Sequence, residues 1–466
     1  MKVPREWDRR RWRRIALLLG IFAYVACFQW MYENYLYPVW DYAGFHYEIP
    51  PAGYLALAWI LALVPSLWMP MELTRPSQLA YWALYIMVFI PSMFVPLYAG
   101  LDAPAEIRWL MLALFVGLAI AGLSYRFPLI RFRPGRISRR HFWNAFLCLA
   151  AVLGLWLAFV FRHHLRLVSF GDVYDVRNDL SDLAEGKPVN FAFMLLTGAI
   201  NPFLMGCGLH YRRKGLLAAG ALGQLLVYSA GGTKGSILSI LFVPALYFLF
   251  HVKHFPFALK MTFGNLALVG SLCICYRLAG FDAGPALTMV LFVVLMRTFS
   301  ANALMTAWYY DFFQWNPHTF FSHLRFVNWF VHFPYQNSIG EEVGWIFIGK
   351  GDVDATANFW AIDGLGGLGL PGVLLISVFC ALVFWTLDSA AQRHDPRLAA
   401  LVTTYAAYNL ANISIFTTLY SGGLALLILA LWLMPPEGRA DFGLAGERAR
   451  RSILPTPRAR PLPIAG

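Results

Sequence analysis

The chain has 466 residues, of which 59% are apolar and only 13% are charged, and its net charge is +12. Soluble domains contain about a quarter charged residues, so this composition excludes an ordinary soluble enzyme and a disordered protein. The composition instead predicts an all-α, polytopic membrane protein.

Twelve apolar stretches approach the length of about 20 residues that a helix needs to cross the hydrocarbon core of a membrane. They are residues 15–34, 52–71, 79–99, 107–124, 142–161, 191–210, 215–230, 236–250, 261–278, 366–387, 398–418 and 421–434. We therefore predict a single integral membrane domain over residues 1–434. The remaining residues, 435–466, are rich in Pro, Arg and Ala and are expected to form a disordered basic tail.

The basic residues divide unevenly between the two sides of the membrane when each stretch crosses once. The segments 1–14, 72–78, 125–141, 210–215, 251–260, 388–397 and 435–466 hold 27 of the 37 Lys and Arg residues, but only 8 of the 25 Asp and Glu residues. Positive residues are retained on the cytoplasmic side of a membrane. We therefore predict that both termini are cytoplasmic, and we interpret the positive charge as an orientation signal and not as a surface for nucleic acid.

One further apolar stretch, residues 285–313, is interrupted by Arg297. If this stretch crossed the membrane, the basic segments after it would move to the outer side. We therefore predict a pair of helices that enters and leaves on the outer side. Two long outer segments, 162–190 and 279–365, then remain, and long loops on a rigid scaffold often carry binding and catalytic residues.

A glycine-rich turn on the outer side contains Lys234, in the sequence Gly-Gly-Thr-Lys-Gly-Ser. Gly232 and Gly235 allow the backbone to turn tightly and to approach a ligand. The residues that follow are expected to open a helix, and a helix N-terminus favours an anion. The alternative interpretation is a flexible hairpin with one lysine that extends towards water.

Several arginines on the outer side are candidates for an anion site. Arg297 stands in an apolar run, where an arginine costs on the order of 3 kcal/mol or more unless it is paired or reaches water. An ion pair with Asp311 is the structural alternative. Arg177 lies among four aspartates, so local ion pairs in a solvated loop are the alternative there. Arg277 and Arg325 are the other two candidates.

Candidate proton acceptors are concentrated in residues 314–365, and we rank Asp354, Asp363 and His323 first. His318 and His323 lack the glutamate of a metalloprotease motif. We predict no metal and no cofactor. Most of the many aromatic residues in this segment are expected to anchor it at the membrane interface, and some of them are alternatively suited to stack on sugar rings.

Several short motifs, taken in order, resemble the oligosaccharide repeat-unit polymerases, the Wzy-type O-antigen or exopolysaccharide polymerases of bacterial envelopes. The motifs are DVYDVR at 172–177, GGTKG at 231–235, the Arg297 helix, ANFWAIDG at 357–364 with GLPGVLL at 369–375, and NISIFTTL at 412–419 with SGG at 421–423. The resemblance covers most of residues 140–434. Family members usually carry arginine where Lys234 stands, and lysine lacks the bidentate fork of arginine.

The resemblance implies a GT-C-like fold in the bacterial inner membrane and a glycosyltransferase that needs neither metal nor nucleotide. A hydroxyl of an incoming lipid-linked repeat would attack the anomeric carbon of the growing chain, and undecaprenyl diphosphate would leave. The implied substrates are undecaprenyl-diphosphate-linked oligosaccharides, and the implied partners are a flippase and chain-length regulator proteins.

Roles for individual residues follow from the resemblance together with the acidic, basic and histidine residues of the outer segments. The implied catalytic residues are Arg297, Arg177, Asp354, Asp363 and His323. The implied diphosphate- or glycan-binding residues are Lys234, Gly232, Gly235, Arg277, Arg325, Asn358 and Trp360. Cations would stabilise the departing diphosphate, and a carboxylate or imidazole would accept the hydroxyl proton.

Three other functions remain open. An O-antigen ligase uses the same donor, and the motifs do not distinguish a ligase well from a polymerase. A lipid-oligosaccharide flippase or polysaccharide transporter would favour charged residues at the membrane midplane and repeat symmetry, whereas the ionisable residues here stand mostly at the ends of spans or in loops. A non-catalytic scaffold of an envelope complex is the third alternative.

Overall fold

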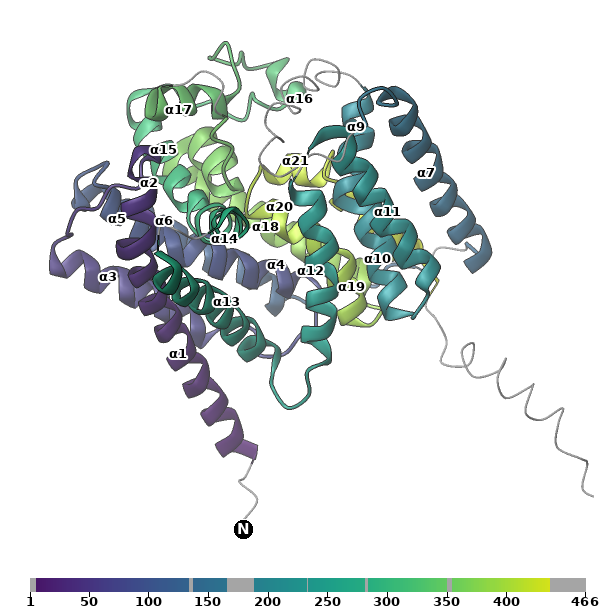
Figure 1. Cartoon of the computed structure of the whole chain (residues 1–466), viewed down its shortest axis with the longest axis horizontal. Helices are drawn as coiled ribbons and strands as arrows, with labels where there is room; N and C mark the ends of the chain where they lie inside the picture. Colours follow the sequence, from purple (N-terminus) through teal and green to yellow (C-terminus); the bar gives the residue numbers. More distant parts are fainter. Residues whose placement is uncertain are drawn as a thin grey trace, which may run out of the picture.

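The computed structural model describes residues 6–133, 137–165, 188–232, 234–280, 284–349 and 354–435, without the side chains of residues 6–10 and of Lys234. These residues form helices and connecting turns, and none of them is in a β-strand. The helices pack side by side into one bundle (Figure 1). The all-α fold class predicted from composition is therefore confirmed for this part of the chain.

The α-helices of the first half of the chain are α1 (Glu6–Met31), α2 (Tyr37–Trp40), α3 (Ala52–Leu63), α4 (Ser77–Ala83), α5 (Ile90–Ala99), α6 (Pro104–Leu123), α7 (Arg139–Val160), α9 (Pro188–Leu195), α10 (Asn201–His210) and α11 (Lys214–Gly231). Those of the second half are α12 (Lys234–His251), α13 (Phe257–Ala279), α14 (Pro285–Leu291), α15 (Ala301–Trp315), α16 (Arg325–Asn328), α17 (Ile339–Ile348), α18 (Gly366–Ala391), α19 (Pro396–Val402), α20 (Thr404–Leu410), α21 (Ile415–Leu419) and α22 (Leu424–Leu433).

Eight helical segments of the described chain are long and apolar enough to cross a membrane. They are Arg11–Ala43, Ser77–Ala99, Pro104–Arg126, Arg139–Val160, Pro188–His210, Phe257–Ala279, Trp360–Ala391 and Ile415–Leu433. Ala52–Leu67 and Gly235–His251 are shorter apolar helices. The chain is thus a multi-pass membrane protein by length and composition. The described residues contain eight full-length spans, or nine if the bent pair α14 and α15 counts as one, and the number of twelve stays a prediction.

Several segments that the charge pattern assigns to the cytoplasmic side meet at one end of the bundle. Arg14 donates hydrogen bonds of 2.9 Å to the carbonyls of Ser66 and Met69. Arg75 donates to the carbonyl of Phe127 at 3.2 Å. Three more bonds to backbone carbonyls join this region to α18, to the turn after it and to α22: Trp385 to Pro128, Arg393 to Phe132 and Trp432 to Arg133. We call this the basic end of the bundle.

The opposite end, which we call the loop end, holds residues 33–51, 100–106 and the described part of 314–365. There, the backbone N–H of Glu48 donates to the carbonyl of Tyr98 at 2.8 Å, and the Gln314 side chain donates to Asp102 at 2.8 Å. Helices α16 and α17 lie at this end, at the top of Figure 1, whereas the N-terminus lies at the bottom. Those described segments that make these contacts and are predicted to share a side of the membrane therefore share an end of the bundle.

The stretch that Arg297 interrupts is a broken helix. Helices α14 and α15 are bent by 42° where a π-helical segment, Phe292–Thr298, ends. Phe292, at the start of the π-helical segment, packs on Trp40 with ring centroids 5.2 Å apart, and Gln314, near the end of α15, bonds to Asp102. Both contacts are made at the loop end, and the entry and exit of the pair on one side of the membrane stay a prediction.

Candidate active site

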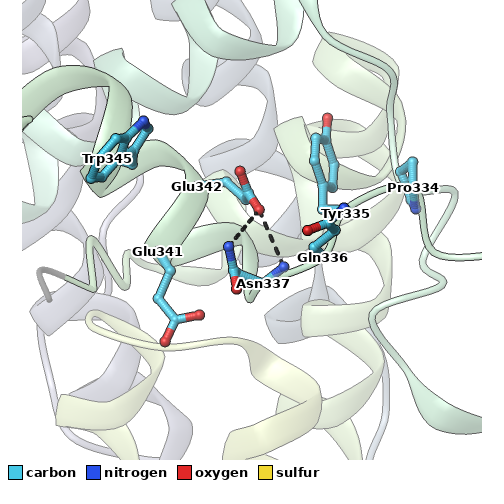
Figure 2. Close-up of a pocket in the computed structure, with 7 residues that line it drawn as sticks. All are labelled: Pro334, Tyr335, Gln336, Asn337, Glu341, Glu342 and Trp345. Atoms are coloured by element: carbon cyan, nitrogen blue, oxygen red, sulfur yellow. Dashed lines mark hydrogen bonds between the residues drawn. The ribbon is translucent and has the colours of Figure 1, made fainter. Parts of the chain in front are cut away.

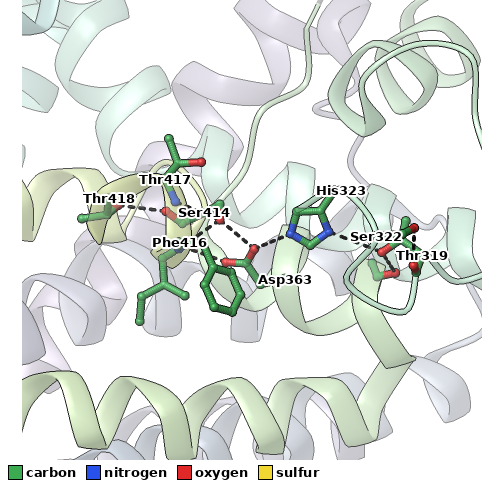
Figure 3. Close-up of polar contacts among 10 residues, drawn as sticks. Thr319, Ser322, His323, Asp363, Ser414, Phe416, Thr417 and Thr418 are labelled. Atoms are coloured by element: carbon green, nitrogen blue, oxygen red, sulfur yellow. Dashed lines mark hydrogen bonds and ion pairs between the residues drawn. The ribbon is translucent and has the colours of Figure 1, made fainter. Parts of the chain in front are cut away.

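The buried carboxylate of Asp363 is the centre of a polar cluster at the loop end (Figure 3). Its Oδ1 accepts hydrogen bonds from Ser414 Oγ at 2.7 Å and from His323 Nε2 at 3.0 Å. Its Oδ2 accepts from the backbone N–H of Ile415 at 2.8 Å. Ser414 is also the N-cap of α21, so this carboxylate lies at a helix N-terminus, where negative charge is stabilised.

The loop that carries His323 is held in an unusual backbone conformation. Phe320 and Phe321 have positive φ angles of 49° and 63°, which cost of order 1–3 kcal/mol each for residues with a side chain. The backbone N–H groups of Thr319 and Phe320 donate to the carbonyls of Gly366 and Gly367, at 2.8 and 3.0 Å. These bonds dock the loop on the start of α18 and bring His323 to Asp363.

The hydrogen bonds assign a proton to one nitrogen of His323. A carboxylate is an acceptor only, so the ring nitrogen that faces Asp363, Nε2, carries the hydrogen in the neutral ring. Nδ1 is then the basic nitrogen. It lies 3.5 Å from the Thr319 hydroxyl, which donates to the Gly366 carbonyl at 3.0 Å. The His323 side chain is 14% exposed, so the arrangement suits acceptance of a proton.

Two of the predicted catalytic residues, Arg297 and Asp363, lie in π-helical segments of the chain. Arg297 belongs to Phe292–Thr298 and Asp363 to Trp360–Leu365. Short π-helical segments within α-helices are frequent at functional sites. The Arg297 side chain is exposed on the surface of the bundle and is not enclosed by the apolar interior. Among the described ion pairs none joins it to Asp311, so the structural alternative is not supported.

The glycine-rich turn around Lys234 has the geometry expected from its sequence. Gly232 ends α11 in the left-handed conformation, with a φ of 60°, and its N–H donates to the carbonyl of Tyr228 at 2.8 Å. Helix α12 then begins at Lys234. A Cβ on Gly235 would lie 2.5 Å from the hydroxyl of Tyr405, so this close approach requires glycine. The side chain of Lys234 lies outside the described residues.

Residues 405–415 connect this turn and Arg297 to Asp363. The Tyr405 and Tyr408 rings are neighbours, with centroids 5.8 Å apart, and Arg297 interacts electrostatically with Tyr408. Asn412 donates to the Tyr408 carbonyl at 2.8 Å, and the next residue but one is Ser414, which bonds to Asp363. Gly235, Arg297 and Asp363 therefore approach the same stretch of α20 and its connection to α21.

Two predicted glycan-binding residues are instead part of the interior. Asn358 is fully buried, its side-chain amide donates to Thr306 Oγ1 at 2.7 Å, and its Oδ1 accepts from the backbone N–H of Trp360 at 3.0 Å. Trp360 is fully buried too, and its indole donates to Ser377 Oγ at 2.9 Å. Neither side chain has a surface on which a sugar could bind in this structure. We reassign both as residues that position the segment carrying Asp363.

The remaining predicted residues are spread over the loop end. Asp354 is exposed and accepts from the Thr356 hydroxyl at 2.7 Å. Arg277 is exposed in the last turn of α13, and Arg325 is exposed at the start of α16, two residues after His323. Arg177 lies outside the described residues, so its expected convergence with Arg297 stays a prediction.

Sequence reasoning missed three polar residues of this cluster. Ser414 and Thr319 carry hydroxyls that contact Asp363 and His323, but serine and threonine are too common to mark a site. Tyr309 is fully buried, its hydroxyl has no hydrogen-bond partner among the described residues, and it interacts electrostatically with Asp354 and Asp363. Its position in an apolar helix, α15, gave it the pattern of an ordinary core residue.

Within the described residues, no three His, Cys, Asp or Glu side chains are close enough together to hold a metal ion. Comparison with protein-family models, with curated proteins and with solved structures finds no match to this chain.

Proposed function

We propose that this chain is a glycosyltransferase of the bacterial inner membrane that polymerises oligosaccharide repeat units linked to undecaprenyl diphosphate. The observation that carries the proposal is the pairing of His323 with the buried Asp363, at 3.0 Å. It presents one basic imidazole nitrogen at the end of the bundle to which we assign the long outer loops. The motif resemblance supplies the substrate class.

In the proposed reaction, a hydroxyl of the acceptor sugar attacks the anomeric carbon of the donor chain. The bond between that carbon and the diphosphate oxygen breaks, and undecaprenyl diphosphate leaves with the bonding electrons. His323 Nδ1 accepts the hydroxyl proton, and Asp363 stabilises the resulting imidazolium from the Nε2 side. General-base catalysis of this kind contributes about 10²–10⁴-fold in rate.

The departing diphosphate requires positive charge where its own charge develops. Arg297 and the N-terminus of α12 with Lys234 are our candidates, because Gly235 and Arg297 approach neighbouring residues of α20. We assign Arg177 to the same anion. The reaction draws its energy from the phosphoester bond of the donor, which agrees with the absence of a nucleotide motif in the sequence.

The proposal places the basic end in the cytoplasm and the loop end in the periplasm, with both termini cytoplasmic and twelve spans in a GT-C-like arrangement. A flippase would deliver the substrate to the periplasmic face, and chain-length regulator proteins would limit the polymer. An O-antigen ligase remains the nearest alternative, because it would use the same donor and the same proton acceptor.

Deletion of the gene, followed by electrophoresis of the surface glycan, separates the alternatives. A polymerase is supported if long chains disappear while single repeats are still attached to their acceptor. Loss of every attached repeat indicates a ligase or a flippase. Extraction of the lipid-linked repeats then distinguishes these two, because the repeats accumulate on the periplasmic face without a ligase and on the cytoplasmic face without a flippase. Unchanged surface glycan contradicts all three functions.

A further inference from the structure

An open pocket of about 640 Å³ lies at the loop end, between the start of α17 and the chain that precedes it (Figure 2). It is lined by Pro334, Tyr335, Gln336, Asn337, Glu341, Glu342 and Trp345. A cavity of this size accommodates a small molecule or a few sugar units. None of these seven residues belongs to the cluster around Asp363.

The first turn of α17 fixes the polar wall of the pocket. Ser338 caps the helix and forms a reciprocal capping box with Glu341, which holds that side chain in place. Glu342 Oε1 accepts from both the backbone N–H and the side-chain amide of Asn337, at 3.2 and 3.1 Å. The described bonds engage only this one oxygen of Glu342. The wall is therefore ordered before any ligand binds.

The chemistry of the lining selects a ligand that donates hydrogen bonds. Carboxylates accept hydrogen bonds and do not donate them. Two of the seven lining residues are acidic and none is basic, so a phosphate or another anion would be repelled. Sugar hydroxyl or ammonium groups supply the missing donors, and the side-chain amides of Gln336 and Asn337 serve ring and hydroxyl oxygens.

Aromatic side chains stand on either side of this polar wall, as Figure 2 shows for Trp345 and Tyr335. Trp345 is 57% exposed, so the face of its indole is available to the apolar face of a ring. The Tyr335 hydroxyl is bonded to the carbonyl of Pro317, and burial, followed by the nearby Glu342, raises its pKa to about 12. The Tyr335 side chain thus remains uncharged and fixed in position, and it forms one wall of the pocket.

The pocket is physically joined to the loop that carries His323. The Tyr335 hydroxyl donates to the carbonyl of Pro317, which stands two residues before Thr319 in the chain. The Tyr335 ring also packs against Phe313, with ring centroids 6.4 Å apart. Phe313 in turn stacks on His318 at 5.5 Å. An oligosaccharide that occupies the pocket would therefore lie beside the loop of the candidate active site.

We propose that the pocket formed by residues 334–345 is a glycan subsite that holds neutral or amino sugars and excludes acidic sugars. The sugars held there would lie some distance from the diphosphate. The inference rests on the proposed function for its assignment to the substrate of that enzyme, and it adds a sugar class that the motif resemblance does not specify. Trp345 supplies the stacking surface, and the carboxylates of Glu341 and Glu342 accept hydrogen bonds from the sugar hydroxyls.

Photocrosslinking in cells tests the pocket with the glycan that the cell makes. The photoreactive residue p-benzoylphenylalanine replaces Gln336, which lines the pocket and leaves Trp345 intact. The matched control places the same residue at Trp329, an 82% exposed aromatic of the same loop outside the pocket. After irradiation, we expect carbohydrate covalently attached to the Gln336 variant and several-fold less on the control.

Two further measurements define the ligand. Trp345→Ala and Glu342→Gln, each combined with the photoreactive residue at position 336, are expected to lower the yield of glycan adduct at least threefold. Hydrolysis of the crosslinked peptide should release neutral or amino sugars. Equal crosslinking at 336 and 329, a yield insensitive to both substitutions, or release of uronic acids as the attached sugars would each overturn the inference.

The outcome is separable from that of the proposed function. If deletion of the gene abolishes long glycan but position 336 carries no sugar, the subsite is wrong and the polymerase proposal stands. If position 336 carries sugar but deletion leaves the surface glycan unchanged, the chain binds glycans and the polymerase proposal fails.

Discussion

His323 and Asp363 are forty residues apart in the chain, yet the imidazole Nε2 lies 3.0 Å from the carboxylate Oδ1. The carboxylate is completely buried, and the imidazole is 14% exposed. One member of the pair is therefore fixed by the interior while the other reaches the surface. This asymmetry is the arrangement that a positioned general base requires, because the buried partner selects the tautomer of the exposed one.

Asp363→Asn is expected to reduce the rate of polymer formation by about a hundredfold or more. The amide can donate to Nε2, and the proton of the neutral imidazole then moves to Nδ1, so the basic nitrogen no longer faces the acceptor. The rate is measured in membranes supplied with lipid-linked repeats. Ser414→Ala is the matched control, because it removes a hydrogen bond to the same oxygen and leaves the tautomer of His323 unchanged. A rate lowered equally in both variants would indicate a merely structural carboxylate.

Arg297→Ala is expected to lower the polymerisation rate by on the order of a hundredfold, since a cation at the departing diphosphate is worth a few kcal/mol. Arg297→Lys should recover little of this loss, because lysine lacks the bidentate geometry. Arg108→Ala is the control, since Arg108 is also exposed and stands in the first helical turns of α6 at the loop end. A full rate for Arg297→Ala would remove this residue from the mechanism.

Lys234→Ala is expected to abolish long glycan in cells without lowering the amount of protein in the membrane, whereas Lys234→Arg should preserve much of it. The two variants differ because a positive charge is required at the start of α12, whereas the shape of the group that carries it is not. Lys214 offers a close control, because it begins α11, another helix of 18 residues, at a position that we assign to the cytoplasmic side. Normal glycan length in Lys234→Ala cells would show that no anion site lies there.

The broken helix pair makes a topological prediction. In a variant without native cysteines, Gly284→Cys and Trp315→Cys flank α14 and α15, and both should react with an impermeant thiol reagent added to the periplasmic side. Arg131→Cys, at the basic end, should remain unlabelled until the membrane is permeabilised. Labelling of only one of the first two positions would show that the pair crosses the membrane.

Composition and the order of basic and acidic segments along the chain were sufficient to predict the helical class, the positions of the apolar helices and the grouping of loops at two ends of the bundle. Each of these properties depends on the composition of one stretch of sequence and not on contacts between distant segments. The number of spans is less directly predictable from such stretches, because apolar helices such as Ala52–Leu67 are shorter than a full-length span in the described residues, and the number of twelve stays a prediction.

The candidate site was only partly predictable, because it depends on contacts between distant segments. His323 and Asp363 were each expected as proton acceptors, but their meeting depends on a loop with two phenylalanines at positive φ, which no local pattern indicates. Asn358 and Trp360 were assigned to a glycan because they stand in a motif that resembles the polymerase family. Amide and indole groups also bond inside a protein, and only burial distinguishes the two cases.

Reconstitution of the purified protein in liposomes tests the central claim most directly. Wild-type protein, His323→Ala and the exposed-histidine control His332→Ala are each incubated with the undecaprenyl-diphosphate-linked repeat, and product chain lengths are measured by gel electrophoresis. We predict multi-repeat products from wild-type protein and from His332→Ala. With His323→Ala, the rate of polymer formation is expected to be at least a hundredfold lower, so that the repeats remain single. Multi-repeat products formed by His323→Ala at the wild-type rate would contradict the account.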